Sequence, residues 1–170
     1  MKIFSVRSIV FLSMMTAISV VLRQAFLGIP NFQLMTAFFF VMIVFWGIPN
    51  SLFVMTLSLI ITGFFNGFGP WIGAQIIDYA LFMLLWSILQ KRFKNLWLQS
   101  VITGGLSFFY GLLISFLTAP FFSVTNFWVF YFQGVHFDCI HAAATMIGYP
   151  ILFKVFERIS EMNTKYNNAI

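Results

Sequence analysis

Long apolar runs alternate with short breaks along this chain of 170 residues. A helix needs about 20 mostly apolar residues, with a range of about 17–25, to cross the hydrocarbon core of a bilayer. Six runs approach this length, and we expect membrane-spanning helices over residues 8–25, 32–46, 51–65, 71–89, 98–119 and 134–156. The second and third runs are short, so these helices would include flanking residues or lie where the bilayer is thin.

The breaks between the runs are rich in residues that favour turns. They fall at residues 27–31, 47–50, 66–70, 91–94 and at Pro120. An aromatic stretch, residues 121–132, precedes the sixth predicted helix, and a polar tail, residues 157–170, follows it. The chain shows no low-complexity segment or clear internal repeat. We therefore predict one membrane-embedded domain over residues 1–170.

The composition supports a membrane protein. Hydrophobic residues make up 61% of the chain and charged residues only 8%, whereas soluble domains carry about 25% charged residues. With one cysteine, Cys139, an intrachain disulfide is impossible. Lys2 and Arg7 before an apolar run resemble the start of a signal peptide, but no small-residue cleavage site follows closely. We therefore interpret this run as the first membrane span.

The basic residues predict how the helices are oriented. Cytoplasmic loops of membrane proteins carry an excess of Lys and Arg. With six spans, only Arg23 of the nine basic residues lies on the outer side. The other eight share one side: Lys2, Arg7, Lys91, Arg92, Lys94, Lys154, Arg158 and Lys165. We expect an all-α membrane protein, a bundle of about six transmembrane helices, with both termini cytoplasmic. No nucleic-acid motif accompanies the net charge of +5, so no nucleic-acid partner is expected.

Ionisable residues inside predicted spans mark candidate functional positions, because they are costly in a bilayer. They are Asp78, His136, Asp138 and His141. Asp138 and His141 are three residues apart and share a helix face. His136 and His141 are five apart and point in different directions, so we expect no metal site. No cofactor is expected either.

Two interpretations of these polar residues remain open. Asp138 and His141 either form a pair that fixes helix packing or form the polar wall of a ligand pocket that opens outward. The aromatic run around Asn126, Trp128, Tyr131 and Gln133 is either a lid or an interfacial aromatic belt. The candidate ligand-binding residues are Asn31, Gln33, Thr36, Asn66, Trp71, Gln75, Asp78, Tyr131, His136, Asp138 and His141.

Small residues predict close helix contacts. Ser13, Thr16 and Ala17 form one small-residue patch in the first predicted helix, where a partner protein could dock. The fifth predicted helix carries another patch, with Ser107, Gly111 and Ser115, for which packing inside the bundle is the better interpretation.

Several segments resemble the substrate-binding S components of energy-coupling factor (ECF) vitamin transporters. The first predicted helix, with residues 12–23, is similar to the opening helix of that family, where two alanines four residues apart dock on the coupling subunit. Ser13 and Ala17 occupy the matching positions. Residues 31–37, 67–71 and 137–142 resemble one subgroup, which we associate first with cobalamin and then with pantothenate.

The resemblance implies a function. The chain would capture a vitamin, most readily cobalamin, outside a bacterial cell membrane. It would then deliver the vitamin to the cytoplasm with a module of one coupling membrane protein and two ATPases. It would not be an enzyme, and no glycine-rich phosphate loop is present. The alternatives are an autonomous small-solute transporter and an intramembrane enzyme using Asp138 and His141 as an acid/base pair with Asp78 opposite. The sequence has no serine-nucleophile or His-Glu-x-x-His zinc motif to support the enzyme.

Overall fold

The computed structural model describes the backbone of residues 5–168 and the side chains of residues 5–161. Helices and connecting loops make up this part of the chain, which contains no strand. The helices are α1 (Val6–Gln24), α2 (Met35–Asn66), α3 (Pro70–Leu89), α4 (Leu96–Thr118), the 3-10 turn η1 (Ala119–Phe121) and α5 (Phe127–Asn168). Within the described range, five helices are long and apolar enough to cross a membrane.

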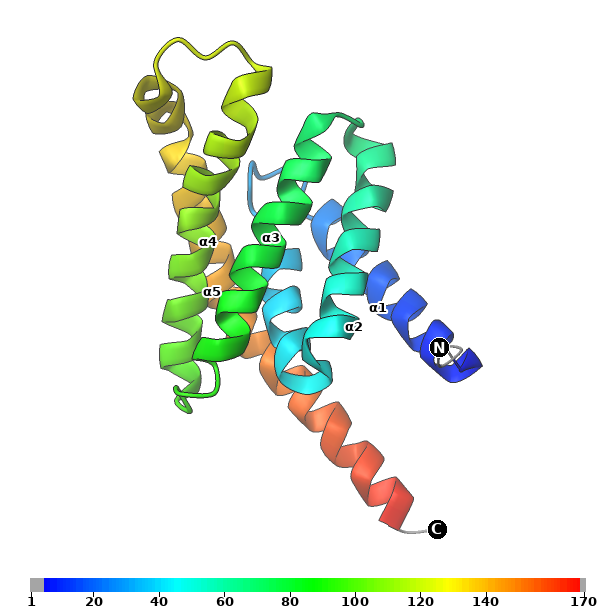
Figure 1. Ribbon diagram of the computed structural model, residues 1–170. Helices are drawn as coiled ribbons and strands as arrows, with labels where there is room; N and C mark the ends of the chain where they lie inside the picture. Colours follow the sequence, from blue (N-terminus) through cyan, green and yellow to red (C-terminus); the bar gives the residue numbers. More distant parts are fainter. Residues whose placement is uncertain (1–4, 169–170) are drawn as a thin grey trace.

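Helix α2 consists of two helical segments joined at Gly47. Gly47 has φ +76° and ψ 174°, which is not helical and lies in a region that favours glycine. Pro49 follows, and proline lacks the N–H that would continue a helix. The ribbon reverses direction here, so both segments rise from one bend (Figure 1). The kink falls inside the predicted break at residues 47–50.

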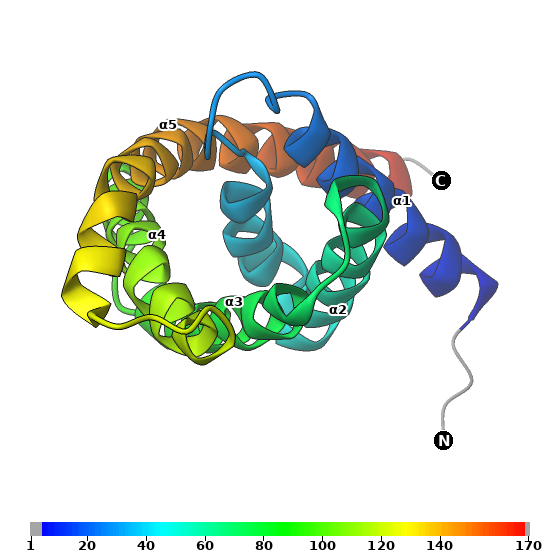
Figure 2. The ribbon, with the colours of Figure 1, turned by 90° about the horizontal axis from the view of Figure 1, so that it is seen from above.

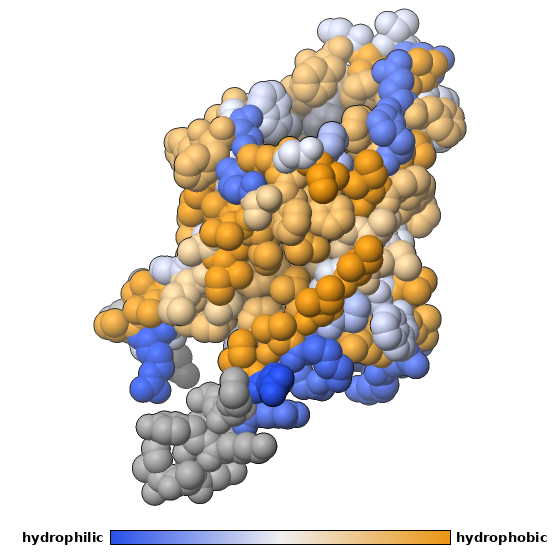
Figure 3. All heavy atoms as spheres, turned by 180° about the vertical axis from the view of Figure 1, so that it is seen from behind, coloured by the Kyte–Doolittle hydropathy of each residue, from blue (hydrophilic) through white to orange (hydrophobic). Residues whose placement is uncertain are grey.

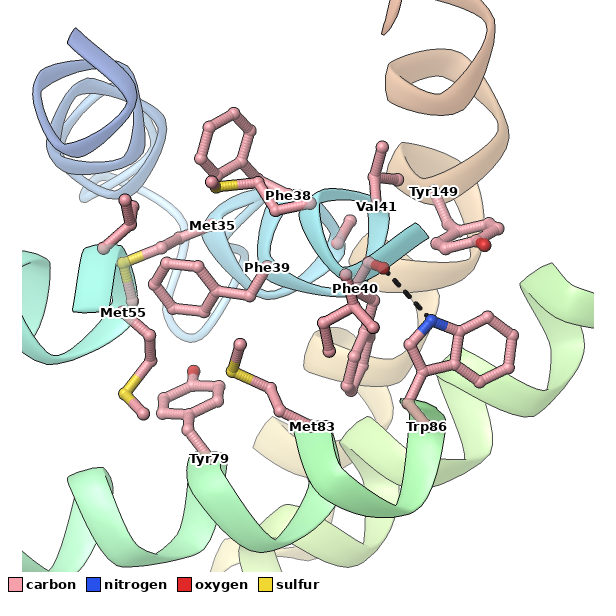
Figure 4. Packing of buried hydrophobic residues seen from close by; sticks show 14 of the residues in the cluster. Met35, Phe38, Phe39, Phe40, Val41, Met55, Tyr79, Met83, Trp86 and Tyr149 are labelled. Carbon is pink, nitrogen blue, oxygen red and sulfur yellow. Dashed lines mark hydrogen bonds between the residues drawn. The ribbon is translucent and has the colours of Figure 1, made fainter. Parts of the chain in front are cut away.

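The first segment of α2, residues 35–46, is the centre of the bundle. Residues 35–43 are all buried, and the other helices surround this segment when the molecule is seen from above (Figure 2). Phe38, Phe39, Phe40 and Val41 point to different sides of it (Figure 4). A helix that is apolar on every face is typically buried. At about 1.5 Å per residue the segment is about 18 Å long, shorter than the roughly 30 Å hydrocarbon core.

Helices α4 and α5 lie close together because α4 has glycines at their interface. A side chain at Gly104 would overlap Met146, and one at Gly111 would overlap the carboxyl group of Asp138. The Ser100 hydroxyl donates a hydrogen bond to the Met146 carbonyl at 2.5 Å. Small residues allow this approach in membranes, and the patch that includes Gly111 thus packs inside the bundle.

The sequence-based limits of the last helix, residues 134–156, are wrong. Helix α5 begins at Phe127 because the Asn126 side-chain oxygen accepts hydrogen bonds from the N–H groups of Trp128 (3.0 Å) and Val129 (3.3 Å), as an N-cap residue does. Its backbone then continues to Asn168, through the stretch predicted to be a polar tail. Polarity ends a membrane span, but it does not end a helix, and residues such as Glu, Met and Lys are good helix formers.

Hydrophobic residues cover the middle of the molecule in the rear view, with hydrophilic residues gathered toward its lower and upper ends (Figure 3). The α3–α4 loop, with Lys91, Arg92 and Lys94, lies at the lower end of Figure 1. The beginning of α1 and the end of α5 also lie in the lower part of that view. The α1–α2 loop, residues 25–34, lies toward the opposite, upper end.

Candidate functional site

A cavity of about 280 Å³ lies beneath the α1–α2 loop, toward the upper end of the bundle. The loop contributes an apolar part, which includes Phe26, Pro30 and Phe32. The polar part comes from α1, the loop, and helices α2, α3 and α4. Its residues are Arg23, Asn31, Gln33, Asn66, Gln75 and Tyr110. Polar and apolar groups together on one concave surface are typical of small-molecule sites.

Arg23 supplies positive charge to this cavity. It lies in the last turn of α1, and its Nη1 donates a hydrogen bond to the Thr62 hydroxyl at 2.9 Å. This bond fixes the guanidinium group between α1 and the second segment of α2. A guanidinium group has five N–H donors, so others can bind a ligand. Between residues 8 and 90 the sequence contains no other Lys or Arg.

The α1–α2 loop is held over the cavity by Asn31. This residue has φ +59°, a left-handed conformation that Asn tolerates better than most residues. Its Nδ2 donates a hydrogen bond to the Phe137 carbonyl of α5 at 3.0 Å. The rings of Phe26 and Phe32 pack against each other, with their centroids 5.1 Å apart. The loop is thus an ordered part of the cavity wall that one polar contact links to α5.

A polar cluster lies below the cavity, where α2, α3, α4 and α5 meet. His141 Nε2 shares a hydrogen bond of 2.7 Å with the Thr36 hydroxyl, which shares another of 3.0 Å with the Tyr79 hydroxyl. The Tyr110 ring lies 4.8 Å from that of Tyr79 and meets the His141 ring edge-on at 5.2 Å. All four side chains are buried. Of these four residues only Tyr110 lines the cavity. The other three lie behind it, and we call the four together the floor.

Two acidic residues lie beside the floor, and neither of them lines the cavity. Asp78 is fully buried, and neither of its carboxyl oxygens has a hydrogen-bond partner among the described residues. Gln75 lies one turn earlier on α3, and its buried side-chain oxygen likewise has no partner in the described chain. Asp138 is buried against Gly111 of α4. Buried polar atoms without partners are costly, and inside a membrane protein they point to a functional site.

The structure brings together most of the predicted ligand-binding residues. Asn31, Gln33, Asn66 and Gln75 line the cavity. Thr36 and His141 form part of the floor, and Asp78 and Asp138 lie beside it.

Three of the predicted residues lie elsewhere. Trp71 packs over Gly69 at the start of α3 and is partly exposed. Tyr131 stacks on Phe127. His136 is exposed and packs against Phe137, because its position on α5 faces away from His141.

The aromatic residues 126–133 do not line the cavity. They form the N-cap and first turns of α5, and Trp128 is 60% exposed. The loop part of the cavity wall comes from residues 25–34 instead.

Sequence reasoning did not assign Arg23, Tyr79 and Tyr110 to the site. In the charge pattern Arg23 is the exception, and a basic residue on the otherwise uncharged outer side is the available signal. Tyr79 follows Asp78 directly and Tyr110 precedes Gly111, so each could have been found as a neighbour of a position already considered.

The predicted docking patch on α1 is divided between two faces. Ser13 and Ala17 are exposed. Thr16 is buried, and its hydroxyl donates a hydrogen bond to the Leu12 carbonyl at 2.8 Å. The exposed face of α1 therefore contains Ser13 and Ala17 but not Thr16.

No known protein family, curated protein or solved structure matches this chain. The fold and the site alone define its class. The chain is an all-helical, multi-pass membrane protein with a cavity of mixed polar and apolar lining among the α1–α2 loop and helices α1 to α4. Across the described residues, no group of three or more His, Cys, Asp or Glu side chains could hold a metal ion.

Proposed function

We propose that this chain is the substrate-binding S component of an ECF-type vitamin transporter in a bacterial cell membrane. The observation that carries the proposal is the cavity beneath residues 25–34, with Arg23 in its wall. The α1–α2 loop, which lines the cavity, lies toward the end of the bundle opposite the basic loop at residues 91–94 (Figure 1). Because basic loops are typically cytoplasmic, the cavity would face the outside. The two segments of α2 would then count as separate spans, and six spans would leave both termini in the cytoplasm.

The size and charge of the cavity favour a compact anion as the ligand. At about 280 Å³ the cavity lies just below the roughly 300–1,000 Å³ range of drug-sized ligand pockets. Cobalamin, a corrinoid with an attached nucleotide, far exceeds this space. Pantothenate is compact and carries one carboxylate, which a guanidinium group binds well. Of the two vitamins that the resemblance suggests, we propose pantothenate.

The transport step would need partner proteins. The sequence contains no phosphate-binding glycine loop, so ATP hydrolysis would come from two ATPase subunits joined by a coupling membrane protein. Ser13 and Ala17 on the exposed face of α1 would dock on the coupling protein. The loaded subunit would then topple in the bilayer and release the vitamin inside the cell.

Ligand-induced thermal stabilisation of the purified protein tests the binding role. The panel contains pantothenate, cobalamin, riboflavin, folate, thiamine, biotin and hydroxymethylpyrimidine. A ligand at 100 times its dissociation constant stabilises the folded state by about 2.7 kcal/mol, and we expect this response from pantothenate. The matched variant Arg23→Gln should lose it. A response to none of the seven compounds would contradict the vitamin-binding role, and a response to cobalamin alone would contradict the choice of ligand.

Bulky substitutions on α1 test the partner module. The double variant Ser13→Leu, Ala17→Leu should bind pantothenate normally but lose uptake in cells that contain the ATPase module. Met14→Leu is the control, because Met14 is also exposed on α1 and keeps a similar volume. Uptake into vesicles that contain this chain alone would favour an autonomous transporter instead.

A further inference from the structure

We infer that the site recognises its ligand at two ends, with a carboxylate bound by Arg23 and hydroxyl or N–H donors bound by Gln75 and Asp78 on the floor. This inference rests on the proposed function and names the ligand class within it. The class is a compact molecule with an acid at one end and hydrogen-bond donors at the other. The argument depends on where donors and acceptors lie around the cavity.

The donor end of the site is Arg23. Its guanidinium group is held by Thr62 at 2.9 Å and lines the cavity together with the α1–α2 loop. The amide group of Asn31 in that loop is already used, since it donates to the Phe137 carbonyl. Gln33 and Asn66 also bring amide donors to the cavity, but Arg23 is the one residue of its lining with a positive charge. Its guanidinium group can take a carboxylate in a bidentate geometry.

The acceptor end of the site lies on α3. Gln75 lines the cavity, and Asp78 follows it on the same helix face, one turn away. Three buried oxygens, Oε1 of Gln75 and both carboxyl oxygens of Asp78, have no hydrogen-bond partner in the part of the chain that the structure describes. These oxygen atoms need hydrogen-bond donors. A ligand that passes Gln75 and reaches Asp78 would supply them.

The hydrogen bonds recorded around Asp78 do not meet this need. The Thr36 and Tyr79 hydroxyls and His141 Nε2 are joined in their own hydrogen-bonded chain. Asp138 brings a second carboxyl group near enough to interact electrostatically with Asp78, and it is an acceptor when ionised. The floor is therefore rich in acceptors, and only part of its donor capacity remains.

This arrangement predicts which ligands are accepted and rejected. A dicarboxylate would bring a second negative charge into a buried region that is rich in acceptors, where an unpaired charge is costly. Pantothenate has hydroxyl groups at the end opposite its carboxylate, and biotin has N–H groups there. Both belong to the inferred class.

The experiment compares pantothenate with pantothenol, which keeps the hydroxyl groups and replaces the carboxylate by an alcohol. Binding is measured by calorimetry on the full-length chain, with biotin as a second probe. The unmodified protein should prefer pantothenate. Arg23→Gln should remove that preference. Asp78→Asn should weaken pantothenate and pantothenol by the same factor, about 2- to 10-fold, as expected for weakening one buried hydrogen bond.

Two further variants separate binding from folding. Gln75→Met removes an acceptor from the cavity wall at a partly exposed position. It should also weaken the binding of both pantothenate and pantothenol. Trp71→Phe, outside the cavity, should weaken neither. Equal affinity of the unmodified protein, Asp78→Asn and Gln75→Met for pantothenate would overturn the two-ended site and leave the vitamin-binding role intact. Absence of binding by the unmodified protein to pantothenate and biotin would overturn both.

Discussion

Two buried regions of this bundle contain polar atoms, and they differ in how those atoms are satisfied. One region, which we call the lower core, contains Trp86, Gln99 and Tyr149. There, Trp86 Nε1 donates to the Phe40 carbonyl at 3.1 Å (Figure 4). The Tyr149 hydroxyl donates to Gln99 Oε1 at 2.9 Å, and Gln99 Nε2 donates to the Phe93 carbonyl at 2.7 Å. Below the cavity, by contrast, the carboxyl oxygens of Asp78 have no hydrogen-bond partner within the described range.

The difference separates residues that stabilise the fold from residues available for binding. A satisfied buried hydrogen bond contributes to stability, and an unsatisfied polar atom costs it. The lower core thus holds the central segment of α2 in place through Trp86, whose ring also packs against Tyr149. The floor of the cavity keeps polar atoms unsatisfied at a cost to stability, as functional sites often do. The two regions should therefore respond in opposite ways to substitution.

The largest effect is expected at Trp86. Replacing it by alanine removes a fully buried indole and its hydrogen bond to the central segment. Truncations of this kind cost about 3–5 kcal/mol, so Trp86→Ala should lower the unfolding temperature sharply or prevent folding. Thermal unfolding in detergent measures this. Trp97→Ala is the matched control because Trp97 is 73% exposed, and an equal loss of stability in both variants would contradict the assignment of the lower core.

A smaller effect on stability is expected when one residue of each region is replaced by a nearly isosteric one. Tyr149→Phe keeps the ring but leaves Gln99 Oε1 without its donor, which should cost about 1–3 kcal/mol. Asp78→Asn is also nearly isosteric, but it breaks no hydrogen bond that the structure records for that side chain. We expect Asp78→Asn to leave the stability of the ligand-free protein unchanged or slightly raised. Unfolding by denaturant or heat compares the two, and a larger loss for Asp78→Asn than for Tyr149→Phe would contradict the comparison.

The sequence predicts most of the helices because long apolar runs with clear ends are strong signals. The predicted breaks at residues 47–50 and 66–70 coincide with the Gly47 kink and with the α2–α3 loop. The sequence does not predict that residues 35–43 form the buried centre of the bundle. In a membrane, helices that face lipid and helices that face protein are both apolar, so the apolar run alone cannot distinguish the two environments.

The sequence identifies several residues of the candidate site, but it does not predict how they are arranged. Ionisable and amide residues inside apolar runs identify Asp78, His141 and Gln75, because such residues are rare in spans. Their partners are not visible in the sequence. Thr36 and His141 are 105 residues apart and meet through packing around the central segment. The role of Arg23 is not visible either, because a single basic residue at the end of a span is also what the charge pattern of membrane loops produces.

The smallest effect is expected at the α1–α2 loop in the cavity wall. Asn31→Gly keeps the left-handed conformation accessible but removes the hydrogen bond to Phe137. This should increase amide hydrogen exchange in residues 25–34, because local opening depends on few contacts there. The unfolding temperature should change little, since the lower core is untouched. Hydrogen exchange followed by mass spectrometry measures both regions in one experiment.

Asn31→Ala separates the hydrogen bond from the backbone conformation. Alanine at φ +59° adds a backbone cost of about 1–2 kcal/mol, so it should open the loop further than Asn31→Gly does. Both variants should also release pantothenate faster, in the same order, because Asn31 and its loop form part of the cavity wall. Unchanged exchange in residues 25–34 for both variants would show that the loop is held by its Phe26–Phe32 contact instead. In that case the loop would depend on apolar packing, as the lower core does, and the contrast between the two regions would be limited to the floor.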